Sequence, residues 1–227
     1  MLESLFAKEL PVSRLYDFQS LPDDTEIVME FRLVYRGPLK SSTASNPRPQ
    51  EKHQIRKQLH TQIRQFWREH PHLKMLMQTS GEFGNPESAV TRWSKDFSRG
   101  AHGFVPLVRQ QEDSFCALNI LFLRRGTPGK IVDQGGDLDN RLKTLFDALK
   151  VPDTARGLPE NPEPDFDPIF CLLQDDSQIT SLAVTTDRIL APQNEGEREE
   201  DVVLVIHVHV YRGTNAAQVT GLSGNVN

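Results

Sequence analysis

Apolar and polar positions along this chain follow two periods, one of two residues and one near 3.6, and these predict its strands and helices. Residues 25–35 alternate and predict a first strand. Residues 115–123 form an almost continuous apolar run, which is typical of a buried strand. Further strands are expected at 169–173, around 182–184 and at 202–211, the last of them strongly β-prone.

Two other segments carry apolar residues at helical spacing. In residues 49–70 these are Ile55, Leu59, Ile63, Phe66 and Trp67, and Pro71 limits the helix. From Leu138 onward they are Leu142, Leu145 and Leu149. Asp139, Lys143 and Asp147 then share a different face of the second helix. The order of strand, helix, strand, helix and three strands predicts an α+β fold with a mixed β-sheet and two main helices.

Between these elements lie segments without a regular pattern. Residues 79–104 are rich in Gly, Ser and Asn and are predicted to be irregular. Residues 152–168 hold five prolines and several acids, which predicts a Pro-rich acidic insertion over about 151–168. With 227 residues, the chain is expected to form a single domain over 1–212, followed by a flexible C-terminal tail over 213–227.

The net charge of −5 conceals an uneven distribution. Residues 151–201 hold 13 acidic side chains against three arginines, so the rest of the chain is positive, with 23 basic side chains against 18 acidic ones. We expect Lys57, Arg64 and Arg68, on the polar side of the first helix, to contact the phosphate backbone of DNA. A solvated helix face would give the same pattern, and this alternative stays open.

The sequence has no feature that would place it in a membrane. No apolar run reaches membrane-spanning length, and residues 1–6 do not begin a signal peptide. We therefore expect a cytoplasmic protein without membrane contact. Cys116 and Cys171 lie far apart without a Cys-x-x-Cys pattern, and we expect both to be reduced and buried.

Acidic side chains gather at two points where the pattern places the ends of elements. Asp137 and Asp139 flank the start of the second helix, and Asp175 and Asp176 directly follow a predicted strand. Oxygen ligands from both points could converge on Mg²⁺, with Mn²⁺ as an alternative, to activate water for phosphodiester hydrolysis. Lys143, one helical turn after Asp139, would neutralise charge in the transition state. Each pair alone is explained by helix capping or a turn, and only their combination favours a metal site.

Two further groups have competing explanations. Asp147 could contact the metal, but an ion pair with Lys143 or Lys150 on the helix surface is the preferred interpretation. His207 and His209 alternate on one face of the last strand and could bind a metal. Because valines and a tyrosine share that face, a partly covered sheet surface is preferred there.

The acidic motifs also carry a family resemblance. Residues 136–149, Gly-Asp-Leu-Asp-Asn-Arg-Leu-Lys-Thr-Leu-Phe-Asp-Ala-Leu, and residues 173–179, Leu-Gln-Asp-Asp-Ser-Gln-Ile, resemble the signature of the RusA-type Holliday-junction resolvases. The resemblance covers roughly residues 115–211 and implies a RusA-like fold. It also implies that Asp137, Asp139 and Asp176 are catalytic, metal-binding carboxylates, that Asp175 supports them, and that Lys143 acts as a catalytic base or stabilises charge.

The function implied by this resemblance is that of a homodimeric, Mg²⁺-dependent endodeoxyribonuclease. Such an enzyme nicks two opposed strands of a four-way DNA junction in recombination and repair, and a two-fold dimer supplies two equivalent active sites. We expect Arg141, inside the matching motif, to join Lys57, Arg64 and Arg68 in contacting branched DNA. The expected location is the cytoplasm, in association with the nucleoid. Two alternatives stay open: a branched-DNA-binding protein without catalysis, and a nuclease that acts on flaps or forks.

Overall fold

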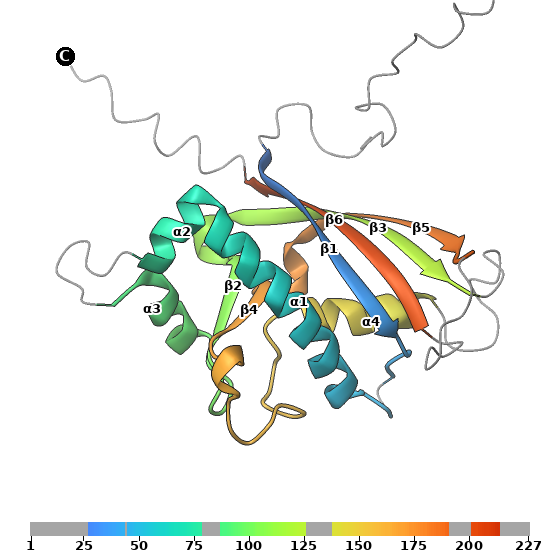
Figure 1. The fold of residues 1–227 in the computed structure, drawn as a ribbon, viewed down its shortest axis with the longest axis horizontal. Helices are drawn as coiled ribbons and strands as arrows, with labels where there is room; N and C mark the ends of the chain where they lie inside the picture. The colour runs from blue at the N-terminus through green and yellow to red at the C-terminus, as the bar shows by residue number, and fades with distance from the viewer. Residues whose placement is uncertain (1–26, 44, 79–86, 126–137, 191–200, 214–227) are drawn as a thin grey trace, which may run out of the picture.

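The computed structural model describes residues 27–43, 45–78, 87–125, 138–190 and 201–213. Helices and a mixed sheet both contribute, so the predicted α+β fold is confirmed (Figure 1). Of the predicted C-terminal tail, all but Gly213 lies outside the described residues. No helix in the described ranges combines the length and the apolar character needed to cross a bilayer.

The main sheet has four strands in the order β1-β6-β3-β5 (Figure 1). β6 (Asp201–Arg212) lies between β1 (Ile27–Pro38) and β3 (Ser114–Arg124) and is antiparallel to both, while β5 (Ile179–Arg188) pairs with β3 in parallel. Side chains at the even positions of β6 from 202 to 210 are fully buried, and those at odd positions are mostly half-buried. The sheet therefore has one core face and one partly open outer face.

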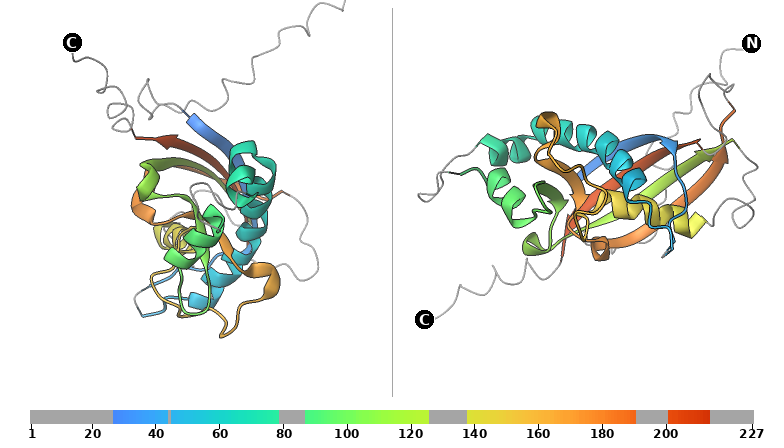
Figure 2. Two further views of the ribbon diagram at one scale, coloured as in Figure 1. Left: turned by 90° about the vertical axis from the view of Figure 1, so that its left-hand side faces the viewer. Right: turned by 90° about the horizontal axis from the view of Figure 1, so that it is seen from below.

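Two helices provide most of the cover for the core face (Figures 1 and 2). They are α1 (Pro49–Glu69) and α4 (Leu138–Leu149), the two helices that the sequence predicts. Nearly all of their predicted apolar positions are buried, among them Ile55, Leu59, Ile63, Trp67, Leu142, Leu145 and Leu149. Proline suits the first position of a helix, and Pro71 accordingly begins a further short helix, α2 (Pro71–Gln78), directly after α1.

The structure contains two elements in or beside the region that the sequence predicts to be irregular. One is α3 (Ala89–Asp96), whose N-cap Ser88 accepts a hydrogen bond from the Thr91 N–H at 3.2 Å. The other is β2 (Phe104–Val108), which pairs in parallel with the predicted strand β4 (Ile169–Leu173) to form a second, two-stranded sheet. Pro106 argues against a strand in the sequence, but a two-stranded sheet leaves each strand a free edge that tolerates proline.

The acidic insertion docks against the rest of the domain and holds only one short 3-10 turn, Pro164–Phe166. The Arg99 side chain donates a hydrogen bond from Nε to the Pro152 carbonyl at 2.7 Å, and His102 Nε2 lies 2.8 Å from the Pro159 carbonyl oxygen. A small second core joins the insertion to the β2–β4 sheet and comprises Phe104, Val151, Ile169 and Cys171, with Leu158 packed against it. The insertion is thus packed against the helices and strands of the fold.

The two cysteines agree with the sequence prediction. Cys116 and Cys171 are free thiols and are buried. Burial raises the pKa of each thiol to about 12, because the thiolate would lose its hydration. Both side chains therefore act as small apolar core residues.

Candidate functional site

The first acidic motif stands at the N-terminal end of α4. Asp137 lies outside the described residues, so its place in a site stays a prediction. Asp139 is exposed in the first turn of the helix, and its Oδ1 atom accepts a hydrogen bond from the Asn140 N–H at 2.6 Å. The free N–H groups and the dipole of the helix start favour a carboxylate here. The Asp139 carboxylate is therefore open to solvent and to a cation.

The remaining polar positions of α4 have different surroundings. Lys143 is exposed one turn beyond Asp139. Asp147 does not pair with Lys143 or Lys150, as the helix spacing suggests; its Oδ2 atom lies 2.7 Å from Nζ of Lys52 on α1. The expected ion pair of Asp147 therefore forms with a different partner, because the packing of α1 against α4 supplies a cation from another element.

The second acidic motif is held by a short 3-10 helix, Asp176–Gln178, at the exit of β4. Asp175 caps this helix through a hydrogen bond from the Ser177 N–H to its Oδ1 atom at 3.0 Å. The buried side chain of Gln178 accepts hydrogen bonds from the backbone N–H groups of Asp175 at 3.0 Å and Gln174 at 3.1 Å. Hydrogen bonds from Ser177 lower the pKa of Asp175 below its ordinary value. This reciprocal capping fixes the backbone of the acidic pair while Asp176 stays exposed.

Lys150, which directly follows α4, faces both acids of this pair. Its Nζ atom lies 3.4 Å from Oδ1 of Asp176 and 3.9 Å from Oδ2 of Asp175, and Asp153 is 3.7 Å away on the insertion. The Lys150 side chain is only 10% exposed. Burial works to lower the pKa of Lys150, but the carboxylates of Asp176, Asp153 and Asp175 more than offset this, and the pKa is raised. A cation therefore already stands beside the acidic pair.

The two acidic motifs stand at opposite ends of α4. With a rise of 1.5 Å per residue, the helix separates the Cα atoms of Asp139 and Lys150 by about 16 Å along its axis. Asp175 and Asp176 accompany Lys150, whereas Lys143 accompanies Asp139. Within the described ranges, Asp139, Asp175 and Asp176 do not bring three ligand oxygens within 4.8 Å of one another. The sequence predicts two groups of acidic residues for the expected site, but not the distance between them.

The basic side chains expected to contact DNA are partly engaged by the insertion. Lys57 Nζ lies 2.7 Å from Oε2 of Glu163 and also over the ring of Phe166, 4.7 Å from its centroid. Arg64 donates from its guanidinium to the Asp165 carbonyl oxygen at 3.0 Å. Arg141 is half-buried on α4. The acidic insertion thus covers one end of the basic face of α1.

A groove runs along that face between α1 and β1, and Asp165 and Phe166 of the insertion line part of it. It has a volume of about 720 Å³, and Arg64 and Arg68 are among its lining residues. Phe31 and Phe66 also line it and stack at a ring-centroid distance of 4.2 Å. Arginines beside aromatic rings suit a nucleic-acid strand, because the cations contact phosphate and the rings can stack with bases.

Comparison with known proteins gives no further assignment. No family model matches the chain, and neither a curated protein nor a solved structure is significantly similar to it. The resemblance to the RusA-type resolvases therefore stays a prediction. Any functional conclusion depends on the geometry of the chain's own residues.

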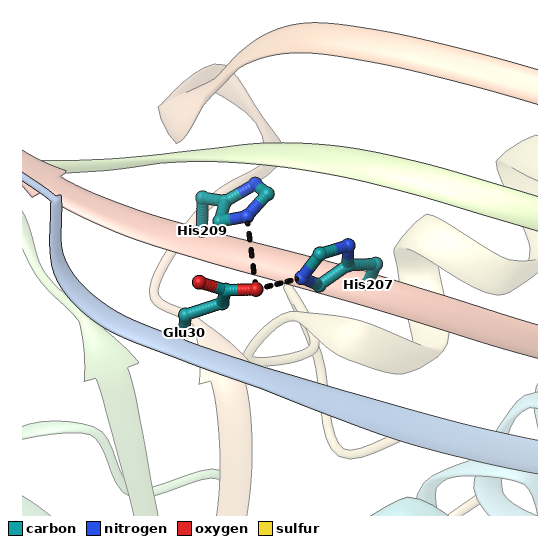
Figure 3. A group of neighbouring side chains, drawn as sticks. All are labelled: Glu30, His207 and His209. Carbon is teal, nitrogen blue, oxygen red and sulfur yellow. Dashed lines mark hydrogen bonds and ion pairs between the residues drawn. The ribbon is translucent and has the colours of Figure 1, made fainter. Parts of the chain in front are cut away.

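One group of potential metal ligands does converge within the described part of the chain. Glu30 of β1 and His207 and His209 of β6 bring their ligand atoms within 4.8 Å of one another on the outer face of the sheet (Figure 3). From the sequence, His207 and His209 are candidate ligands but Glu30 is not. The missing signal is the strand register, which sets Glu30 directly opposite His209 and cannot be read from either segment separately.

Proposed function

We propose that this protein is a Mg²⁺-dependent, structure-selective DNA endonuclease that resolves four-way junctions by paired nicks, acting on nucleoid DNA in the cytoplasm. The observation that carries the proposal is the fixed presentation of Asp175 and Asp176 at a strand exit. The buried side chain of Gln178 accepts two backbone hydrogen bonds from this turn and donates one to the Ser114 carbonyl oxygen. These bonds hold the turn in place, while Asp176 faces solvent. The turn uses the Asp175 carboxylate as its cap and does not need the second, exposed carboxylate of Asp176.

The donor set fits magnesium. Mg²⁺ prefers oxygen ligands, keeps several waters, and is usually held by one or two carboxylates together with substrate phosphate. Asp175 and Asp176 provide two such carboxylates on one rigid turn, and the lowered pKa of Asp175 keeps that side chain ionised. When bound, the metal would supply a water of lowered pKa as the attacking nucleophile.

The basic residues have separate tasks in this proposal. Arg64 and Arg68 in the α1 groove bind the DNA backbone, which positions a phosphodiester without reading its sequence. Lys143 neutralises negative charge that develops on the cleaved phosphate. Lys150 screens the two carboxylates from each other until the metal binds. Asp139 and Asp137 supply the second group of carboxylates for the metal.

The distance between the two acidic points favours a dimer. A two-fold partner whose α4 runs antiparallel to the first would set Asp139 of one copy near Asp176 of the other, and each dimer would then contain two combined sites. A complementation experiment tests this arrangement. Asp139→Asn and Asp176→Asn proteins, each inactive alone, should regain cleavage at one of the two sites when mixed. No recovery in exchanging dimers would contradict shared sites.

The enzymatic proposal is tested with labelled four-way junctions, flaps and linear duplex. Wild-type protein with Mg²⁺ should nick the junction at paired positions, and EDTA should abolish the reaction. Asp176→Asn and Lys143→Met should remove cleavage but leave junction binding, whereas Asp153→Asn, which changes a neighbouring exposed acid, should keep cleavage. If the protein cleaves flaps faster than four-way junctions, the proposed chemistry stands and the proposed substrate class changes to flaps.

A second candidate is a branched-DNA-binding protein without nuclease activity. The observation that favours it is the separation of Asp139 from the Asp175–Asp176 pair along α4. Junction binding that depends on Arg64 and Arg68, with no nicking at any Mg²⁺ or Mn²⁺ concentration, would select this candidate over the nuclease.

A further inference from the structure

The outer face of the sheet carries a Glu-His-His group on two neighbouring strands. His207 Nε2 lies 2.6 Å from Oε1 of Glu30, and His209 Nε2 lies 3.5 Å from the same oxygen (Figure 3). The two imidazole rings are 4.2 Å apart between centroids, with planes inclined by 53°. All three side chains point into one small space above the pair of strands (Figure 3).

The strand register explains why this group is preformed. Glu30 is paired directly with His209 across β1 and β6, and His207 lies two residues along β6 on the same side. The backbone of both strands is fixed by the hydrogen bonds of the sheet. The His207 and His209 side chains are only 13% and 7% exposed, so their rings have little rotational freedom to lose on binding, whereas Glu30 is 49% exposed.

We propose that Glu30, His207 and His209 form a binding site for a late first-row divalent cation, best represented by Zn²⁺. Two imidazole nitrogens with one carboxylate oxygen are a typical three-ligand zinc set that leaves a fourth position for water. Imidazole donors select zinc, copper and nickel over magnesium, which prefers oxygen. At a zinc–nitrogen distance of about 2.0–2.1 Å, ligand atoms of a tetrahedral site lie about 3.3 Å apart. The site therefore needs the Glu30–His207 pair to open by less than 1 Å, a change that the exposed glutamate can make.

This site is independent of the proposed nuclease centre. The side chains of Leu204, Ile206 and Val208 at the even positions of β6 face the core formed with α1 and α4, so the odd positions face the other way. Asp139, Asp175 and Asp176 belong to α4 and to the exit of β4, not to β1 or β6. Loss of zinc binding would leave the endonuclease proposal untouched, and the reverse is equally true.

One neighbouring charge opposes a cation at this site. Arg32 is exposed on β1, directly opposite His207 and on the same face of the sheet. A positive side chain near the ligands weakens the binding of a divalent ion by like-charge repulsion. The proposal therefore predicts not only which variants lose affinity but also one that gains it.

Binding would join the edge strand of the sheet to its neighbour. β1 is the outermost strand on its side, and Glu30 is the ligand that it contributes. An ion that binds the folded but not the unfolded chain stabilises the fold in proportion to the logarithm of its concentration over the dissociation constant. Zinc binding should therefore also raise the temperature at which the protein unfolds.

The test uses the full chain without an affinity tag, stripped of metal with EDTA and then dialysed. Titration with Zn²⁺ by calorimetry should give one ion per chain, and Co²⁺ should give the absorption bands of a tetrahedral site with nitrogen and oxygen ligands. Glu30→Gln and His207→Ala should each weaken Zn²⁺ binding at least tenfold. His72→Ala, which removes an exposed histidine of α2, should leave the affinity unchanged, and Arg32→Gln should increase it several-fold.

Three outcomes would overturn the proposal. One is an absence of Zn²⁺ binding up to millimolar concentration by wild-type protein. Another is equal Zn²⁺ affinity in the wild type and the Glu30→Gln variant, since that variant keeps the size of the side chain and removes its charge. The third is a Zn²⁺ affinity that depends on His72 instead of His207. Thermal unfolding of each metal-free variant separates loss of the site from loss of the fold.

Discussion

Lys57 on α1 and Glu163 in the acidic insertion form an ion pair at 2.7 Å across a sequence separation of 106 residues. The hydrogen bond from Lys57 lowers the pKa of Glu163, so this carboxylate stays charged at neutral pH. The insertion therefore neutralises a lysine that the sequence assigns to DNA contact. Glu163 of the insertion and a bound DNA backbone would therefore compete for Lys57.

Glu163→Gln should release Lys57 for phosphate contact. We expect tighter junction binding at low salt, and one more phosphate contact should steepen the dependence of log affinity on log salt by about 0.9. Fluorescence anisotropy over a range of salt concentrations measures both quantities. Glu160→Gln makes the same change of net charge at an exposed position of the insertion. If both variants behave alike, overall charge and not the Lys57 pair determines affinity.

Lys150→Met should change the metal requirement of cleavage. The ammonium lies within 4 Å of both Asp175 and Asp176 and competes with any cation for them. Two unit charges 4 Å apart interact by about 1 kcal/mol in bulk water and more strongly beside a largely buried lysine, so the Mg²⁺ concentration for half-maximal cleavage should fall at least about fivefold. Complete loss of cleavage would instead make Lys150 part of the catalytic machinery. Lys143→Met, near the middle of α4, should remove cleavage without changing Mg²⁺ affinity.

The stability of the fold should fall with acid between about pH 6.5 and pH 4. His60 and His53 are buried, and burial lowers the pKa of each to about 4 from an ordinary value of 6.5. In that window the unfolded chain binds more protons than the folded chain, so stability is complete above it and decreases as pH falls through it. Each histidine contributes up to about 1.4 kcal/mol per pH unit.

Nδ1 of His60 accepts a hydrogen bond from the Phe170 N–H at 2.9 Å, which ties α1 to β4 and requires a neutral ring. His60→Asn can keep an acceptor at this point but cannot be protonated. Urea unfolding at pH 7.5 and pH 5 should therefore show a smaller acid loss in His60→Asn than in the wild type. The same substitution at exposed His72 serves as the control. An unchanged pH slope in His60→Asn would assign the acid sensitivity to other groups.

Gly157→Ala should destabilise the domain by about 2–4 kcal/mol. Gly157 has a φ of +84°, and an added Cβ would lie 2.4 Å from Cβ of Pro49 at the start of α1. Gly100→Ala is a graded control, because its φ of +60° brings similar backbone strain but its nearest new contact is 3.2 Å away. Denaturant midpoints should show the larger loss for Gly157→Ala. Equal losses would mean that Pro49 can move away from the insertion.

The parts of the fold that follow from local pattern are predictable from the sequence, and the parts that depend on pairing are not. The stripe Leu142, Leu145 and Leu149 identifies α4 because helical spacing is a local property. β2 is not predicted, since its five residues give too short a pattern and the strand depends on its parallel partner β4. In the same way, Asp139 and Asp176 can be selected as acids at element ends, whereas their positions at opposite ends of α4 depend on how β4 packs.

The central place of β6 in the main sheet affects how the chain can fold. Among the described strands, β1 pairs only with β6, which lies near the other end of the described chain, and β3 also pairs with β6. During synthesis, β1 therefore stays without its partner strand until residue 212 has left the ribosome. Contacts between such distant segments slow folding, because a large loop must close before they form. We expect α1 and α4 to form early and the sheet to assemble last, with β1 exposed to pairing with other chains in the meantime.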